Sequence, residues 1–146
     1  MKIYELVHMH RAEVLSDGRF HKSFHCGDIA ILGFFKSLDE VSTTIKFYKN
    51  IEGFRNYPNG FVVFEHEIEG DEASIYVAFF YMHDEEYEFE YSRDLGIFTC
   101  ESDACHAIKN FRQNNLINWD NDKLVAESGV DKYVLGEMNC TDGFEF

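Results

Sequence analysis

Two stretches of the chain decide its fold, because each reads as a short apolar strand that runs into an amphipathic helix. The first, Leu32–Asn50, is LGFFKSLDEVSTTIKFYKN, and the second, Leu95–Gln113, is LGIFTCESDACHAIKNFRQ. At a spacing of 63 residues they share Leu32/Leu95, Gly33/Gly96, Phe35/Phe98, Ile45/Ile108 and Lys46/Lys109. An internal repeat of this kind indicates one supersecondary unit that is used twice.

The helical part of each stretch is recognised by its apolar spacing. Positions i, i+4 and i+7 are apolar in both copies and would line one face of a helix: Val41, Ile45 and Tyr48, then Ala104, Ile108 and Phe111. Ser37 with Glu40 predicts a capping box, in which the serine hydroxyl accepts a backbone N–H and the carboxylate reaches back. In the second copy Ser102 or Asp103 is the expected cap.

Strand-like runs flank both stretches and complete the repeated unit. Runs that open at Ile3 and Ile75 precede them, and Phe61–Ile68 and Tyr133–Met138 are the expected closing strands. The unit is therefore strand, strand, helix, strand. We expect an α+β fold in which an antiparallel or mixed sheet is backed by two helices. The expected organisation is one compact domain, 1–146, built of two related halves, about 1–72 and 73–146.

Composition narrows the class of protein. Hydrophobic residues make up 45% of the chain and aromatic residues 16%, which is enough to bury a core. Thirteen Lys and Arg against 27 Asp and Glu give a net charge of −14, which disfavours nucleic acid and anionic lipid and favours basic partners. No signal peptide or membrane-spanning run is recognised, and the four cysteines show no CxxC pair, so we expect a cytoplasmic protein with reduced thiols.

The acidic residues are concentrated in one tract. Between Arg55 and Arg93 there is no Lys or Arg, and ten carboxylates alternate there in strand-like fashion. Two adjacent acidic strands would present a charged face to a basic partner, although such residues can equally form the solvated face of half-exposed strands. The residues expected to contact the partner are Glu65, Glu67, Glu69, Asp71, Glu72, Asp84, Glu85, Glu86, Glu88, Glu90, Tyr87, Tyr91 and Trp119.

Catalysis is the competing interpretation. His8 and His10 lie two apart on a probable strand, and His25 and Cys26 follow, so a metal- or thiol-dependent site there is one alternative. Adjacent residues on a strand point to opposite faces, which argues against a His25–Cys26 couple. The chain has no GxSxG, P-loop, GxGxxG or HExxH motif. We therefore expect no enzyme activity, no metal and no cofactor; a stand-alone regulatory domain is a further alternative.

Several short motifs resemble those of a small bacterial domain family of unestablished activity. They are His8-Met9-His10, the strand end Gly33–Ser37, the turn GFRNYPNGF at Gly53–Phe61, and Thr141–Phe144. The turn is the most specific of them, and the likeness is best over about the first seventy residues. The chain departs from the family in carrying Val7 where an aromatic residue is common, and in its second copy. The resemblance implies the fold and a bacterial origin.

In size, acidity and lack of catalytic motifs, the chain also resembles the immunity proteins of contact-dependent growth inhibition and related toxin systems. This likeness implies a protein that binds and neutralises a cognate basic toxin domain. We expect the protein to be a monomer or a weak dimer on its own. A nuclease is the expected toxin, because a nuclease site gathers Lys and Arg for phosphates.

Overall fold

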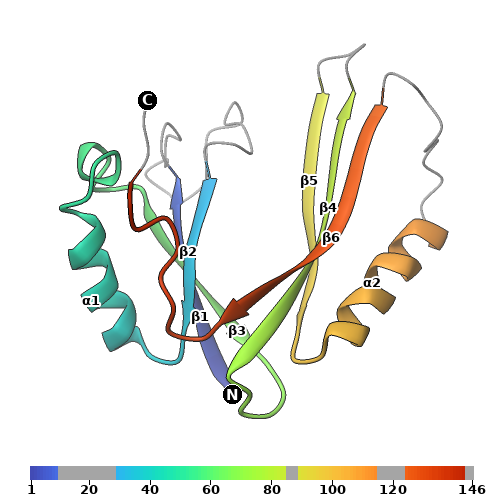
Figure 1. Ribbon diagram of the computed structural model, residues 1–146, viewed down its shortest axis with the longest axis horizontal. Coiled ribbons are helices and arrows are strands. Elements are labelled where there is room, and N and C mark those ends of the chain that lie inside the picture. The colour runs from blue at the N-terminus through green and yellow to red at the C-terminus, as the bar shows by residue number, and fades with distance from the viewer. Residues whose placement is uncertain (10–28, 85–88, 115–123, 144–146) are drawn as a thin grey trace. The chain divides into compact units, whose positions relative to one another are not determined.

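The structure divides into two compact units. The computed structural model describes residues 1–9, 29–84, 89–114 and 124–143 (Figure 1). The first unit comprises Met1–Glu67 and Leu135–Phe146, and the second comprises Ile68–Val134. The chain thus passes from the first unit to the second at Ile68 and returns to the first unit at Leu135.

The first unit contains a three-stranded sheet and one helix. Its elements are β1 (Lys2–Met9), β2 (Ile29–Phe35), α1 (Leu38–Tyr48), a 3-10 turn η2 (Phe54–Asn56) and β3 (Phe61–Glu67). The strands are antiparallel in the order β2-β1-β3. Helix α1 covers the sheet over a cluster of buried side chains: Leu6, Leu32, Phe35, Val41, Tyr48 and Phe54. Val41 and Tyr48 are buried and Ile45 is half-buried, so the predicted helical face is confirmed.

The second unit repeats this arrangement. Its elements are β4 (Ser74–Asp84), β5 (Phe89–Phe98), α2 (Glu101–Asn114) and β6 (Leu124–Val134), and its antiparallel sheet has the order β5-β4-β6. Helix α2 contacts all three strands, with the Phe111 ring 4.8 Å from the Phe80 ring. The predicted α+β fold is confirmed, and the sheets are antiparallel rather than mixed.

The two sheets agree residue by residue. Tyr4 pairs with Phe35, and Leu6 with Gly33; in the second unit Tyr76 pairs with Phe98, and Ala78 with Gly96. Immediately after the glycine pair both ladders shift register, so Leu32 and its counterpart Leu95 are bulged. Both glycines adopt a positive φ, +154° for Gly33 and +140° for Gly96, and an added Cβ would strike the ring of the phenylalanine two residues on. The repeat therefore includes the β-bulge. Both bulges need glycine, because the positive φ and the neighbouring ring leave no place for a side chain.

The turn motif GFRNYPNGF has a structural role around one buried histidine. His8 is fully buried, its Nε2 lies 2.9 Å from the backbone oxygen of Tyr57, and its ring packs edge-on against Phe54 and Phe61. A Cβ on Gly60 would lie 2.7 Å from His8 Nε2, so only glycine allows the turn to close over the ring. The turn and the first strand thus form one packed unit.

The C-terminal segment differs from prediction. The closing strand expected at Tyr133–Met138 is wrong, because β6 ends at Val134. Residues 135–139, here called the strap, instead run along the outer edge of β2: Gly136 N–H donates to Phe34 O (2.8 Å) and Asn139 N–H donates to Leu32 O (2.8 Å). The Tyr48 hydroxyl donates to Asn139 O. Figure 1 shows the strap in dark red beside β2 and α1.

Candidate protein-binding site

The first predicted acidic row is partly neutralised within the first unit. Glu65 Oε1 lies 2.9 Å from Lys2 Nζ, and Glu67 Oε1 lies 3.3 Å from the N-terminal amine. The hydrogen bond from Lys2 to Glu65, with the charge of that carboxylate, raises the pKa of Lys2. These two glutamates are exposed, but each already pairs with a cation of Met1 or Lys2, and they therefore offer less to a partner than the sequence suggests.

The expected three-residue face on β3 is wrong in part. The strand ends at Glu67, so Glu69 does not continue its alternation. Glu69, Asp71 and Glu72 instead lie exposed in the connection between β3 and β4. On the opposite face His66 is half-buried and its Nε2 lies 2.9 Å from the buried Glu5, whereas Phe64 stays 37% exposed because β3 is an edge strand.

The two acidic strands do not form one grid. β3 pairs with β1 in the first unit and β5 pairs with β4 in the second, so the expected adjacency in a single sheet is wrong. Each strand instead performs its own role within a repeat, β3 as the closing strand and β5 as the hairpin partner.

The second predicted row lies on the β4–β5 hairpin. Asp84 ends β4, while Glu90 and Tyr91 lie in the first turn-proximal positions of β5 after Phe89, where their Cα partners are His83 and Met82. The remaining predicted contact residues lie outside the described residues: Glu85, Glu86, Tyr87, Glu88 and Trp119.

Net charge is divided unequally between the units. Ile68–Val134 contains fifteen Asp and Glu but only five Lys and Arg, a net −10 of the total −14. Even if every cation of the second unit paired with a carboxylate of that unit, most of its negative charge would remain. The exposed carboxylates that the structure describes there include Glu69, Glu72, Asp94, Glu101 and Asp103.

A groove between α1 and the strap is the second surface of interest. It has a volume of about 520 Å³ and is lined by Phe35, Asp39, Glu40, Thr43, Thr44, Phe47, Gly136 and Met138. Phe47 and Met138 are 39% and 41% exposed. The Thr43 and Thr44 hydroxyls donate to carbonyls of their own helix, at 3.0 and 2.7 Å. The groove therefore presents an apolar surface beside two carboxylates, which suits an apolar side chain flanked by a basic one.

The histidine site of the competing interpretation receives no support from His8. Its Nε2 is engaged with Tyr57 O and the ring is enclosed by aromatic side chains, so a metal could reach it only if the turn opened. His10, His25 and Cys26 lie outside the described residues. Within the part of the chain that the structure describes, no group of three or more His, Cys, Asp or Glu side chains could hold a metal ion.

Helix α2 carries a reactive feature that the sequence analysis missed. It begins at Glu101, so Cys100 occupies the place that Ser37 takes before α1, and the expected caps Ser102 and Asp103 are wrong. Cys100 Sγ lies 2.9 Å from Ser102 Oγ. That hydrogen bond, with the backbone N–H groups of Asp103 and Ser102, lowers the pKa of the exposed Cys100 thiol. The 63-residue spacing, extended from Ser37, would have identified this position.

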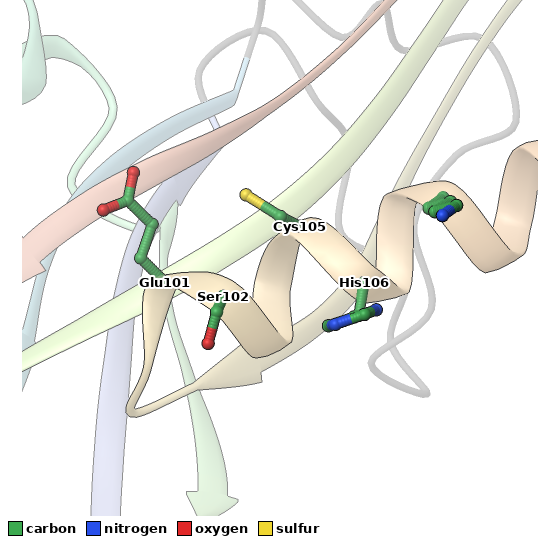
Figure 2. A pocket seen from close by; sticks show the side chains of 5 residues that line it. Glu101, Ser102, Cys105 and His106 are labelled. Atoms are coloured by element: carbon green, nitrogen blue, oxygen red, sulfur yellow. The ribbon is translucent and has the colours of Figure 1, made fainter.

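A shallow pocket of about 450 Å³ lies on the same helix and is lined by Glu101, Ser102, Cys105, His106 and Lys109. Figure 2 shows Glu101 and Cys105 pointing to one side of the helix, and Ser102 and His106 to the other. Cys105 and His106 therefore do not form a nucleophile–base couple, which requires the two side chains to meet.

Comparison with known proteins adds no relative. No protein-family model, curated protein or solved structure matches this chain. No helix among the residues described here has the length and apolar character needed to cross a membrane.

Proposed function

We propose that this chain is an immunity protein, a binding module without catalytic activity that neutralises a basic bacterial toxin domain in the cytoplasm. The observation that carries the proposal is the net charge of −10 in the second unit. Charge of one sign held in so small a unit destabilises the folded chain by self-repulsion. A partner rich in Lys and Arg would relieve that repulsion and would be attracted from a distance.

A nuclease is the toxin class that this surface suits best. Nuclease sites gather Lys and Arg against phosphates, and an acidic protein surface can occupy such a site in place of the nucleic acid. Electrostatic attraction of this kind raises association rates by about 10–10³-fold and weakens as salt is added. The proposed complex requires no cofactor, and the immunity protein would be monomeric before it meets the toxin.

The groove of the first unit would contribute a different part of the binding energy. Exposed charges mainly govern the association rate, whereas buried apolar anchors dominate the affinity. Phe47 and Met138 provide the exposed apolar surface of the groove. The carboxylates of Asp39 and Glu40 lie beside it and could pair with a Lys or Arg of the toxin. An anchor residue of the toxin inserted there would slow dissociation.

The test is co-purification with the C-terminal domain encoded by the adjacent open reading frame, followed by association kinetics. The double substitution Glu69→Lys/Glu72→Lys changes exposed carboxylates of the second unit. Glu52→Lys/Asp142→Lys is the matched control, because it changes the net charge equally on exposed positions of the first unit. We expect the first pair to slow association about tenfold at low salt and the control to slow it much less.

Two results would contradict the proposal. If the adjacent domain does not co-purify, it is not the partner of this protein, and the proposed function is wrong. Equal slowing by the two double variants would show that the whole molecule, not the second unit, attracts the partner. Melting curves of both variants verify that the fold is retained.

A further inference from the structure

The outer edge of β5 is the counterpart of the β2 edge that binds the strap. In the first unit the strap is hydrogen-bonded to Phe34 O and Leu32 O. The shared register makes Ile97 the counterpart of Phe34, and Leu95 the counterpart of Leu32. The carbonyls of Leu95 and Ile97 therefore point away from β4, toward the side on which an added segment would lie.

The bulge glycines have different surroundings at the two edges. A Cβ on Gly33 would lie 2.5 Å from the backbone oxygen of Glu137, because the strap passes directly over it. The atoms nearest to a Cβ on Gly96, apart from its chain neighbours, all belong to the ring of Phe98, at 2.8–3.8 Å. Gly96 thus has the same bare backbone as Gly33, but its nearest contacts do not include a backbone atom like Glu137 O.

The sheet order agrees with this comparison. β5 is the end strand of its sheet, and among the described helices and strands of the second unit it contacts β4 and α2. An end strand with unpaired N–H and C=O groups is the surface on which an extended segment of another chain can add as a new strand.

We propose that the β5 edge binds an extended, basic segment of the toxin partner, which pairs antiparallel to β5 as the strap pairs with β2. This inference rests on the proposed function for the identity of the partner. Charge selects the occupant, since the second unit carries a net −10 and Asp94, Glu101 and Asp103 are exposed on β5 and on the first turn of α2. Backbone hydrogen bonds would provide the register, and Lys or Arg side chains would meet these carboxylates.

The experiment uses the full chain and a synthetic peptide with the sequence of residues 133–139, with Lys in place of Glu137. Amide resonances of the chain are followed as the peptide is added. We expect shifts centred on Leu95 and Ile97. The control peptide carries N-methyl groups at the positions of Gly136 and Asn139, which removes the two donors and keeps the side chains. We expect it to bind at least tenfold more weakly.

Shifts centred on Leu32 and Phe34 would mean that the peptide displaces the strap, and would overturn the proposal. Equal binding of the N-methylated peptide would overturn it too, because backbone pairing would not be involved. The variant Ile97→Pro removes an outward N–H at an edge position that tolerates proline, and should abolish peptide binding without unfolding the chain. The amide shifts of the unaltered chain decide the question if this variant fails to fold.

A second arm separates this inference from the proposed function. Hydrogen exchange of the chain bound to the toxin domain should show protection at Leu95 and Ile97. If the toxin binds and β5 stays unprotected, the edge proposal is wrong and the proposed function stands. If the peptide binds at β5 but the toxin domain does not bind at all, the edge is a strand-addition site and the proposed function is wrong.

Discussion

The two units of this protein share a fold but differ in three respects: the cover of one sheet edge, the residue before the helix, and the net charge. The β2 edge is covered by the strap, whereas the corresponding β5 edge has no such cover among the described residues. Ser37 precedes α1 where Cys100 precedes α2. The first unit has twelve acidic and eight basic residues, a net −4, whereas the second has fifteen and five, a net −10. The comparison teaches that one framework can keep its internal register while its edges and charges change.

The largest expected difference concerns the bulge glycines. Both Gly33→Ala and Gly96→Ala place a side chain at positive φ, which costs about 1–3 kcal/mol. At Gly33 the new Cβ also strikes the strap backbone, which cannot rotate away as a phenylalanine ring can. We expect Gly33→Ala to lower the free energy of unfolding by about 1–3 kcal/mol more than Gly96→Ala. Denaturant unfolding of both variants measures this, and equal losses would show that the strap does not press on Gly33.

An intermediate effect is expected from Tyr48, whose hydroxyl holds the strap. Tyr48→Phe removes the hydrogen bond to Asn139 O, and we expect a loss of about 1 kcal/mol together with faster hydrogen exchange at Gly136 and Asn139. The second unit lacks this bond among its described residues, so exchange in β5 should not change. Unchanged exchange in the strap would contradict this role for the hydroxyl.

Tyr48 also predicts a pH dependence. Burial raises its pKa from the ordinary 10.0 to about 12. The folded state thus favours the protonated phenol, so this contribution is fully present below pH 10 and is lost as the pH rises through about 12. Melting temperatures of the unaltered chain and of Tyr48→Phe should converge over that interval. A constant difference would contradict the assignment.

The smallest effects are expected at the helix caps. Ser37→Ala removes the hydroxyl that accepts Glu40 N–H at 3.2 Å, and should cost about 1 kcal/mol. Cys100→Ser should preserve α2, because serine is the residue that precedes α1.

Iodoacetamide should modify Cys100 faster than the other exposed cysteines that the structure describes, Cys105 and Cys140, because the pKa of the Cys100 thiol is lowered. Equal rates for the three thiols, measured by mass spectrometry of peptides, would contradict the lowered pKa.

Much of the fold could be predicted from local patterns. The spacing of Val41, Ile45 and Tyr48 identified α1 and its buried side, and Ser37 with Glu40 identified its start. The match of Gly33 with Gly96 identified the repeat, which the shared bulges confirm. The strap could not be identified in this way. A continuation of β6 and an extended segment along the edge of β2 have the same local sequence pattern.

The candidate site was less predictable for a related reason. Alternation on β3 correctly indicated exposed glutamates, but the partners of Glu65 and Glu67 come from the other end of the first unit. The expectation that β3 and β5 are neighbours failed because strand order depends on pairing between distant segments. The Cys100 cap was overlooked because cysteine is not among the usual capping residues.

The repeated unit, the helix faces and the excess of negative charge could be predicted from the sequence alone, because they depend on residue type and on spacings of a few positions. Three other features depend on long-range packing: the strap belongs to the first unit, His8 is enclosed by its turn, and Glu65 meets Lys2. Each of these contacts joins residues far apart in the chain, and many long-range pairings are compatible with the same local pattern. Packing of the whole chain selects among them.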